Sequence, residues 1–360
     1  MRSLRRRRTA APTAGDPAGA ETASSTATAR ADVLIRDGRR LDAIELLTAA
    51  NRDLRDAAIE RKLVGLRNVA FDDLDKTSGA AVWPPDAPDL FPGVAGIPEI
   101  AGSDLTAELL RSGILRHGAL IVRGLLPEAR VSHLVADIDR TFVARDAFFA
   151  GSPVQETEPW YVPFEPESGT AAIGPIRKWV REGGGVLTVE SPRSMFDVLD
   201  TFAAVGLTEP LTGYLGERPV LGAKKWTLRK VPLDTTADWH QDGAFLGQGV
   251  RAVNVWLSLS HCGDTAPGLD IVAGRLHDLA PRGTEGAWFD WSVGDSVARS
   301  LAGGAEIMRP IFEPGDAILF DDMNLHRTAV TPEMTHERYA IESWFFAPSH
   351  YPDAQIPVTF

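Results

Sequence analysis

Cysteine, long apolar runs and positive charge are all scarce in this sequence. Its single cysteine, Cys262, excludes an internal disulfide, and it excludes zinc or iron–sulfur sites built on several thiolates. No run of about 18 apolar residues occurs, and the basic start of the chain is followed by small polar residues, so we expect neither a membrane span nor a secretory signal. These features together predict a cytoplasmic protein.

The net charge of −12 over 360 residues is unevenly distributed. Residues 1–30 carry six arginines and two acidic residues, a local charge of +4, which leaves −16 for the remaining 330. An acidic body binds nucleic acid poorly, so we expect no nucleic acid and, without a membrane span, no membrane among the partners. The Ala, Thr, Ser and Gly content of residues 1–30 predicts a disordered basic tail. The oligomeric state is left open.

The rest of the chain divides into three parts. Residues 31–77 form a predicted helical N-terminal segment, in which apolar positions at helical spacing indicate two amphipathic helices broken near Gly38 or Asn51. Five prolines and several glycines make residues 78–99 a predicted linker. One domain is expected over residues 100–360.

This domain is predicted to begin with helices and to continue mainly as strands. Helices are expected from Leu105, capped by Ser103 or Asp104, and over 128–142 and 194–205, whereas 147–190 is typical of a loop. Apolar runs bounded by turn residues predict strands at 119–124, 226–231, 252–259, 317–320 and 339–346. The pattern indicates a mainly β, α+β fold in which a barrel or sandwich is flanked by helices.

Two histidines and one aspartate form the strongest candidate site. His240 and Asp242 are two residues apart after a predicted strand, so in an extended segment both side chains point to the same side. His326 follows a later strand and supplies a third ligand. Two imidazoles and one carboxylate on one face of a metal favour non-haem Fe(II) over zinc. The alternatives are a hydrogen-bonded pair at a strand end for His240 and Asp242 and a buried core position for His326.

Full reduction of O2 at one iron needs extra electrons, which a chelating 2-oxo acid supplies by decarboxylation. Its far carboxylate then needs a cation, and Arg338, twelve residues after His326 at the start of a predicted strand, offers a bidentate fork. Thr328 faces the same side as His326 and can add a hydroxyl. The alternatives are a surface ion pair of Arg338 with Glu333 or Glu337 and an ordinary strand threonine.

Taken together, these motifs resemble the phytanoyl-CoA dioxygenase family of Fe(II)/2-oxoglutarate-dependent oxygenases. The resemblance covers roughly residues 100–347. It is carried by His240-Gln241-Asp242, Trp256, Ala266-Pro267-Gly268-Leu269, Gly315-Asp316-Ala317-Ile318-Leu319-Phe320, His326 and Arg338. The chain departs from the family at Ala273-Gly274-Arg275-Leu276-His277, where Pro-Gly-Ser-His is frequent, which affects the local loop and its substrate contacts.

The resemblance implies a double-stranded β-helix (jelly-roll, cupin-like) with helices packed on one face. It implies iron on His240, Asp242 and His326, with 2-oxoglutarate held by Arg338 and Thr328. The implied reaction is oxidation of a C–H bond in a small organic molecule, hydroxylation by default, with O2 consumed and succinate and CO2 formed. Related halogenases replace the metal aspartate by a small residue, so Asp242 favours hydroxylation. The alternatives are a cupin-like metalloenzyme that does not use 2-oxoglutarate and a non-catalytic ligand-binding barrel.

Several other residues have two readings each. Gln241 is a candidate contact for 2-oxoglutarate or substrate and equally a solvent-facing residue. Aromatic residues suit either a substrate wall or the core: Trp160, Tyr161, Trp226, Trp239 and Phe245. Four basic residues of one predicted strand could contact an anionic substrate or simply face solvent, and we favour the solvent-facing interpretation: Lys224, Lys225, Arg229 and Lys230. The remaining histidines, including His261 and His336, are expected to be structural.

Overall fold

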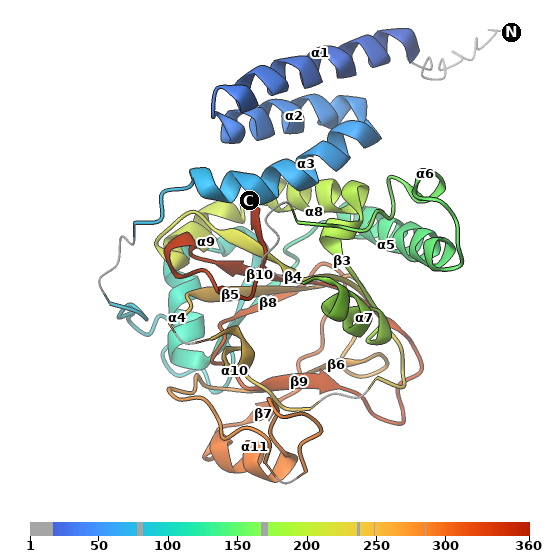
Figure 1. Ribbon diagram of the computed structural model, residues 1–360. Helices are drawn as coiled ribbons and strands as arrows, with labels where there is room; N and C mark the ends of the chain where they lie inside the picture. Colours follow the sequence, from blue (N-terminus) through green and yellow to red (C-terminus); the bar gives the residue numbers. More distant parts are fainter. Residues whose placement is uncertain (1–16, 78–81, 167–171, 236–237, 248, 285) are drawn as a thin grey trace, which may run out of the picture.

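The computed structural model describes residues 17–77, 82–166, 172–235, 238–247, 249–284 and 286–360. Two sheets dominate it, and helices cover one side of the larger sheet (Figure 1). The larger sheet has eight strands in the order β1-β2-β8-β5-β10-β4-β11, with β3 paired to β4. Their bounds are β1 Glu99–Ala101, β2 Ala119–Arg123, β3 Gly185–Leu187, β4 Val220–Val231, β5 Ala252–Ser258, β8 Ala317–Phe320, β10 Arg338–Phe346 and β11 Pro357–Thr359. The mixed α+β character predicted from the sequence is confirmed.

The smaller sheet runs in the order β7-β6-β9, with both pairs antiparallel. Its strands are β6 Gly268–Val272, β7 Ile307–Met308 and β9 His326–Ala329. A buried apolar cluster combines residues of both sheets, including Trp256 of β5, Ile271 of β6 and Trp344 of β10. The two sheets therefore pack face to face through this cluster.

The opposite face of the larger sheet is covered by helices. Because strand side chains alternate, Val253, Val255 and Leu257 of β5 pack with the helices, while Ala252 and Trp256 lie in the cluster between the sheets. The covering helices are α4 Ala107–His117, α5 Glu128–Phe149, α8 Pro192–Ala204 and α9 Thr208–Leu215. The other helices of this part of the chain are α6 Val154–Thr157, α7 Gly174–Glu182, α10 Gly243–Leu246 and α11 Asp295–Ala302.

Three N-terminal helices stack on the α8 side of this layer (Figure 1). They are α1 Pro17–Arg36, α2 Arg40–Leu54 and α3 Ala57–Val69. The prediction of disorder up to residue 30 is wrong from Pro17 onward, and residues 1–16 lie outside the described residues. The physical reason is that α1 is rich in alanine, the best helix former, and buries Ala27 and Ala31 against α2 and α3.

The breaks between these helices were predicted only in part. The first break lies at Gly38, whose φ of 75° ends α1. The second lies after Leu54 instead of at Asn51, because Asp56 caps α3 by accepting hydrogen bonds from the backbone N–H groups of Ala58 and Ile59. Asn51 lies inside α2, where its side chain bonds Glu60 and the Asp56 backbone.

Other element predictions need similar corrections. The loop expected over 147–190 contains α6, α7 and β3, and α5 continues to Phe149. The cap of α4 is Thr106, whose hydroxyl accepts from the backbone N–H of Leu109, and not Ser103 or Asp104. Residues 82–98 of the Pro-rich segment contain no helix or strand. Within the described ranges, no helix is both long and apolar enough to cross a membrane.

Candidate metal centre

The three predicted ligands meet at the edge of the smaller sheet. His240 forms an isolated antiparallel bridge with His326, the first residue of β9, and the two residues exchange both backbone hydrogen bonds (2.9 and 3.1 Å). Their imidazole rings lie 4.4 Å apart between centroids. Asp242 follows at the start of α10, where its buried carboxylate faces both rings. The local backbone pairing is therefore what brings residues 86 positions apart to one point.

Both imidazoles are oriented by main-chain carbonyls. Nδ1 of His240 lies 2.9 Å from the carbonyl oxygen of Asp238, and Nδ1 of His326 lies 3.2 Å from that of Asn324. A carbonyl only accepts, so Nδ1 donates and Nε2 of each ring carries its lone pair toward the other ligands. Burial, reinforced by the neighbouring His240, lowers the pKa of His326 to about 4, which keeps this imidazole neutral.

The ligand atoms converge without a donor between them. Oδ2 of Asp242 lies 3.6 Å from Nε2 of His326 and 3.9 Å from Nε2 of His240, and it accepts no hydrogen bond from any described group. Three electron pairs that face one another in a buried site repel unless a cation lies among them. The donor set therefore fits a metal ion with two nitrogen ligands and one oxygen ligand, the combination typical of non-haem Fe(II).

A lysine that sequence reasoning assigned to solvent lies beside this carboxylate. Nζ of Lys225 lies 2.6 Å from Oδ1 of Asp242 and 3.6 Å from Oε1 of Glu342. Burial acts to raise the pKa of Asp242, but its charged surroundings, with the ammonium of Lys225 first among them, outweigh this effect, so the net pKa is lowered. The carboxylate is therefore held ionised, as a metal ligand must be.

Lys225 belongs to a charged row on the inner face of the larger sheet. Arg229 of β4 pairs with Glu342 of β10 at 3.5 Å, and Thr227 donates a hydrogen bond to the same carboxylate. The β4–β10 register shifts between Ser343 and Phe345, and such an irregularity re-aims strand side chains. The sequence contained a signal for Glu342, because it lies four residues after Arg338 on one strand and so on the same face.

Arg338, the predicted carboxylate anchor, is buried between the sheets. Its Nη1 donates to the carbonyl oxygens of Pro267 and Gly268 at 3.0 and 2.9 Å, and its guanidinium lies 5.1 Å from the ring centroid of Trp256. Nε has no acceptor, and no described carboxylate pairs with this arginine. Burial lowers the pKa of Arg338 to about 10. The surface ion pair considered from the sequence is absent among the described residues.

Thr328 and Gln241, the two other residues predicted to contact 2-oxoglutarate, differ in whether they face the triad. Thr328 lies two residues after His326 on β9, opposite Leu269 of β6, and therefore on the same face as His326. Gln241, in contrast, uses its amide structurally: Nε2 donates to the carbonyls of Met323 and Asp278, and Oε1 accepts from the Ala280 backbone. Gln241 therefore holds surrounding loops together.

Of the five aromatic candidates, only Phe245 lies at the triad. Its ring stacks on His240 at 6.3 Å between centroids. The other four belong to hydrophobic clusters elsewhere: Trp160, Tyr161, Trp226 and Trp239. Sequence reasoning missed Trp291, which lies edge-on to His240 at 5.4 Å and stacks on Phe289 at 4.8 Å. An aromatic wall of Phe245, Phe289 and Trp291 thus extends from the histidine toward solvent.

Two other histidines that the sequence assigned to structural roles bond to exposed neighbours and do not approach the triad. His261 bonds Asp264 and Glu313, and His336 bonds Thr335. A second group of potential ligands, not foreseen from the sequence, contains His133, Asp137 and Asp197.

In this second group, both oxygens of Asp197 accept from the guanidinium of Arg55, and Arg140 lies 3.5 Å from Asp137. These arginines already supply positive charge to the group. The His240 group is therefore the better metal candidate.

No family model and no curated protein matches the chain. Solved structures do align with it. EctD from S. alaskensis, crystallised with 2-oxoglutarate and 5-hydroxyectoine, shares 17% identity at a TM-score of 0.42, over 65% of this chain and 74% of EctD. The nogalamycin-biosynthesis carbocyclase SnoK, described as non-heme and alpha-ketoglutarate (2-oxoglutarate) dependent, shares 14% identity at 0.42, over 69% and 86% of the chains. The likewise alpha-ketoglutarate-dependent epimerase SnoN shares 16% identity at 0.39, over 68% and 82%. At these scores, function has to be argued from the site.

Proposed function

We propose that this chain is a non-haem Fe(II)/2-oxoglutarate-dependent dioxygenase that oxidises, and by default hydroxylates, a C–H bond of a small organic molecule, with succinate and CO2 as co-products. One observation carries the proposal. The half-buried His240 and the buried Asp242 and His326 point their ligand atoms at one another, while the buried guanidinium of Arg338 has no carboxylate partner among the described residues of the same inner surface. The first feature suits a metal, and the second suits an anionic cosubstrate.

In this proposal, Nε2 of His240, Nε2 of His326 and Oδ2 of Asp242 hold the iron. The bound iron, together with 2-oxoglutarate and O2, supplies the oxidising equivalent that removes hydrogen from the substrate. The protein fixes the ligand orientation through the two Nδ1 contacts and keeps Asp242 ionised through Lys225. The packed sheets on either side limit the access of water to the reacting groups.

The spacing between triad and arginine supports a dicarboxylate. Arg338 binds the carbonyl of Gly268, and His326 pairs with Ile271 on the same strand. Three residues of a strand span roughly 10 Å. A five-carbon dicarboxylate can chelate the metal with its 2-oxo acid end and reach Arg338 with the other. We propose that Thr328, which pairs with Leu269 between these two points, donates a hydrogen bond to the far carboxylate.

The wider expectations follow the same reasoning. We propose that residues 100–360 form the oxygenase domain, that the two facing sheets constitute a double-stranded β-helix of jelly-roll type, and that the family is that of phytanoyl-CoA dioxygenase. The free, buried Cys262 suits a cytoplasmic location. The substrate is a small molecule that contacts the aromatic wall beside His240.

The test is succinate release from 2-oxoglutarate by the full chain with Fe(II) and O2, with and without a metabolite extract. We expect extract-stimulated succinate formation that is lost in His240→Ala and kept in His336→Ala, whose exposed imidazole bonds only a neighbouring threonine. Metal binding without any turnover of 2-oxoglutarate would favour a cupin-like metalloenzyme instead. Absence of both metal binding and 2-oxoglutarate turnover would favour a non-catalytic ligand-binding barrel.

A further inference from the structure

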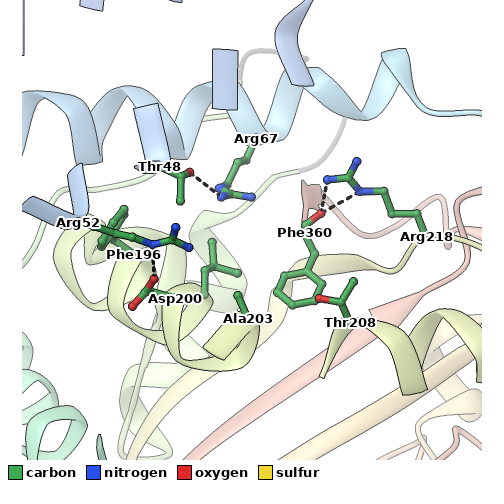
Figure 2. Close-up of a pocket in the computed structure, with 10 residues that line it drawn as sticks. Thr48, Arg52, Arg67, Phe196, Asp200, Ala203, Thr208, Arg218 and Phe360 are labelled. Carbon is green, nitrogen blue, oxygen red and sulfur yellow. Dashed lines mark hydrogen bonds and ion pairs between the residues drawn. The ribbon is translucent and has the colours of Figure 1, made fainter. Parts of the chain in front are cut away.

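A cavity lies away from the triad, where the N-terminal helices meet the main body (Figure 2). Its volume is about 380 Å³, within the range of small-molecule sites. The lining comes from α2, α3, α8, the start of α9 and the last residue of the sequence. None of these elements carries a triad residue, so the cavity is independent of the proposed active site.

Three arginines and one carboxylate line this cavity. Arg52 of α2 pairs with Asp200 of α8 at 2.8 Å, and Asp200 is shared with Arg130 at 3.4 Å. Arg218 donates to the main-chain oxygen of Phe360 through two nitrogens, at 3.0 and 2.8 Å. Among the lining side chains, three guanidiniums therefore face one carboxylate.

Arg67 is the deepest of the three. It is 93% buried, since only 7% of its surface is exposed, and its described hydrogen bonds go to neutral oxygens: the Thr359 carbonyl at 2.8 Å and the Thr48 hydroxyl at 3.2 Å. Burial, followed by the charge of nearby Arg218, lowers the pKa of Arg67 to about 10. The guanidinium of Arg67 therefore shares a partly enclosed space with that of Arg218, and no described side-chain carboxylate pairs with either of them.

Most of the remaining lining is apolar. It consists of Phe196, Leu199 and Ala203 of α8 and Phe360, together with the two threonines Thr48 and Thr208. A cavity of this volume is larger than one phosphate or carboxylate group needs. Its chemistry therefore matches a molecule with an acidic end and a hydrocarbon or ring body.

We propose that this cavity binds a small organic anion, with its carboxylate or phosphate group against Arg67 and Arg218 and its apolar body against Phe196 and Leu199. Such a ligand contacts α3 and α8 at once. Because it binds only the folded arrangement, it stabilises the packing of the N-terminal helices on the main body.

The test measures binding to the full-length protein by calorimetry and by the shift in melting temperature. Two probes separate the acidic groups: hexanoate and phenyl phosphate. Two further compounds separate charge from apolar body: 1-hexanol and inorganic phosphate. We expect saturable binding of hexanoate or phenyl phosphate, with at least about tenfold weaker binding of both control compounds, since each lacks one of the two recognised features.

A matched pair of variants locates the site. Ala203 and Ala204 are neighbouring exposed residues of α8, and only Ala203 lines the cavity. Ala203→Trp fills the space and should abolish probe binding, whereas Ala204→Trp should leave it unchanged. Neither variant removes a described hydrogen bond, so both are expected to fold.

A second pair tests the charge. Arg218→Gln should weaken binding about tenfold, the loss of one charge-assisted contact, whereas Arg39→Gln at an exposed position outside the cavity should not. The proposal is overturned if neither probe binds, if 1-hexanol binds as tightly as hexanoate, if inorganic phosphate matches phenyl phosphate, or if Ala203→Trp binds like the unmodified protein.

Discussion

Replacement of Arg338 by Gln removes the one buried guanidinium that we assign to the far carboxylate of 2-oxoglutarate. The side chain lies between the two sheets with 2% of its surface exposed, and the Nη1 edge is occupied by the carbonyls of Pro267 and Gly268. We therefore propose that the edge that carries Nε, which has no acceptor of its own, binds the cosubstrate. A glutamine amide is shorter and neutral, so it can neither reach as far nor attract the carboxylate.

The magnitude follows from two charge-assisted hydrogen bonds. At about 1.5 kcal/mol each, their loss costs roughly 3 kcal/mol, or about 150-fold in affinity. We therefore predict a rise of about two orders of magnitude in KM for 2-oxoglutarate. The kcat should change much less once 2-oxoglutarate is saturating, because the metal ligands are untouched. The carbonyls of Pro267 and Gly268 lose their hydrogen-bond donor, so the free energy of unfolding should also fall by about 1–3 kcal/mol.

The assay is succinate formation as a function of 2-oxoglutarate concentration, at a temperature where circular dichroism shows the variant folded. Arg309→Gln is the control, because Arg309 pairs with Asp270 on the outer side of β6. An unchanged KM in Arg338→Gln, or an equal rise in Arg309→Gln, would refute the assignment of Arg338.

Three further predictions concern metal binding, pH and backbone geometry. Lys225→Met removes the charge that lowers the pKa of Asp242, so Mn(II) affinity should fall more steeply below neutral pH than in the unmodified protein; parallel profiles in calorimetry would contradict this. Burial and a neighbouring carboxylate raise the pKa of Asp137 to about 8 from 3.8, so the folded protein keeps a proton that the unfolded chain releases, and stability falls as pH rises between about 4 and 8. Asp137→Asn should flatten that fall, by up to about 1.4 kcal/mol per pH unit, and identical melting profiles would exclude it. Gly118 has a φ of +83°, and a Cβ added there would lie 2.6 Å from a backbone carbonyl carbon, so Gly118→Ala should lower the free energy of unfolding by at least about 2 kcal/mol. Gly206→Ala, at a φ of +70° in open space, should lower it by only about 1 kcal/mol. Equal losses in denaturant unfolding would show that crowding at Gly118 is unimportant.

The triad residues could be named from the sequence, but the expected local geometry was too simple. An extended segment was expected to carry His240 and Asp242, whereas His240 lies in an isolated β-bridge and Asp242 has a helical backbone at the start of α10. Their side chains still converge with that of His326, which follows the strand run ending at Phe320. The burial of Arg338 follows from its place at the start of a β strand, where alternation along one strand was sufficient.

The inner charged row could not be predicted in the same way. Lys225 faces inward on a strand whose pairing with β10 shifts register, and a register shift is a property of two strands together. Trp291 lies in a segment without regular alternation, so its contact with His240 depends on how the loop folds back. Residues 17–30 were misjudged because the alanines of α1 stabilise a helix chiefly by packing on α2.

The most direct test of the metal centre is an anaerobic Fe(II) titration of the full chain, followed by calorimetry. We predict one tight site that disappears in His326→Ala and persists in His133→Ala, whose imidazole belongs to the second group of potential ligands. Addition of 2-oxoglutarate should tighten Fe(II) binding in the unmodified protein. Tight binding that survives His326→Ala, or that is lost in His133→Ala, would contradict the assignment of the centre to His240, Asp242 and His326.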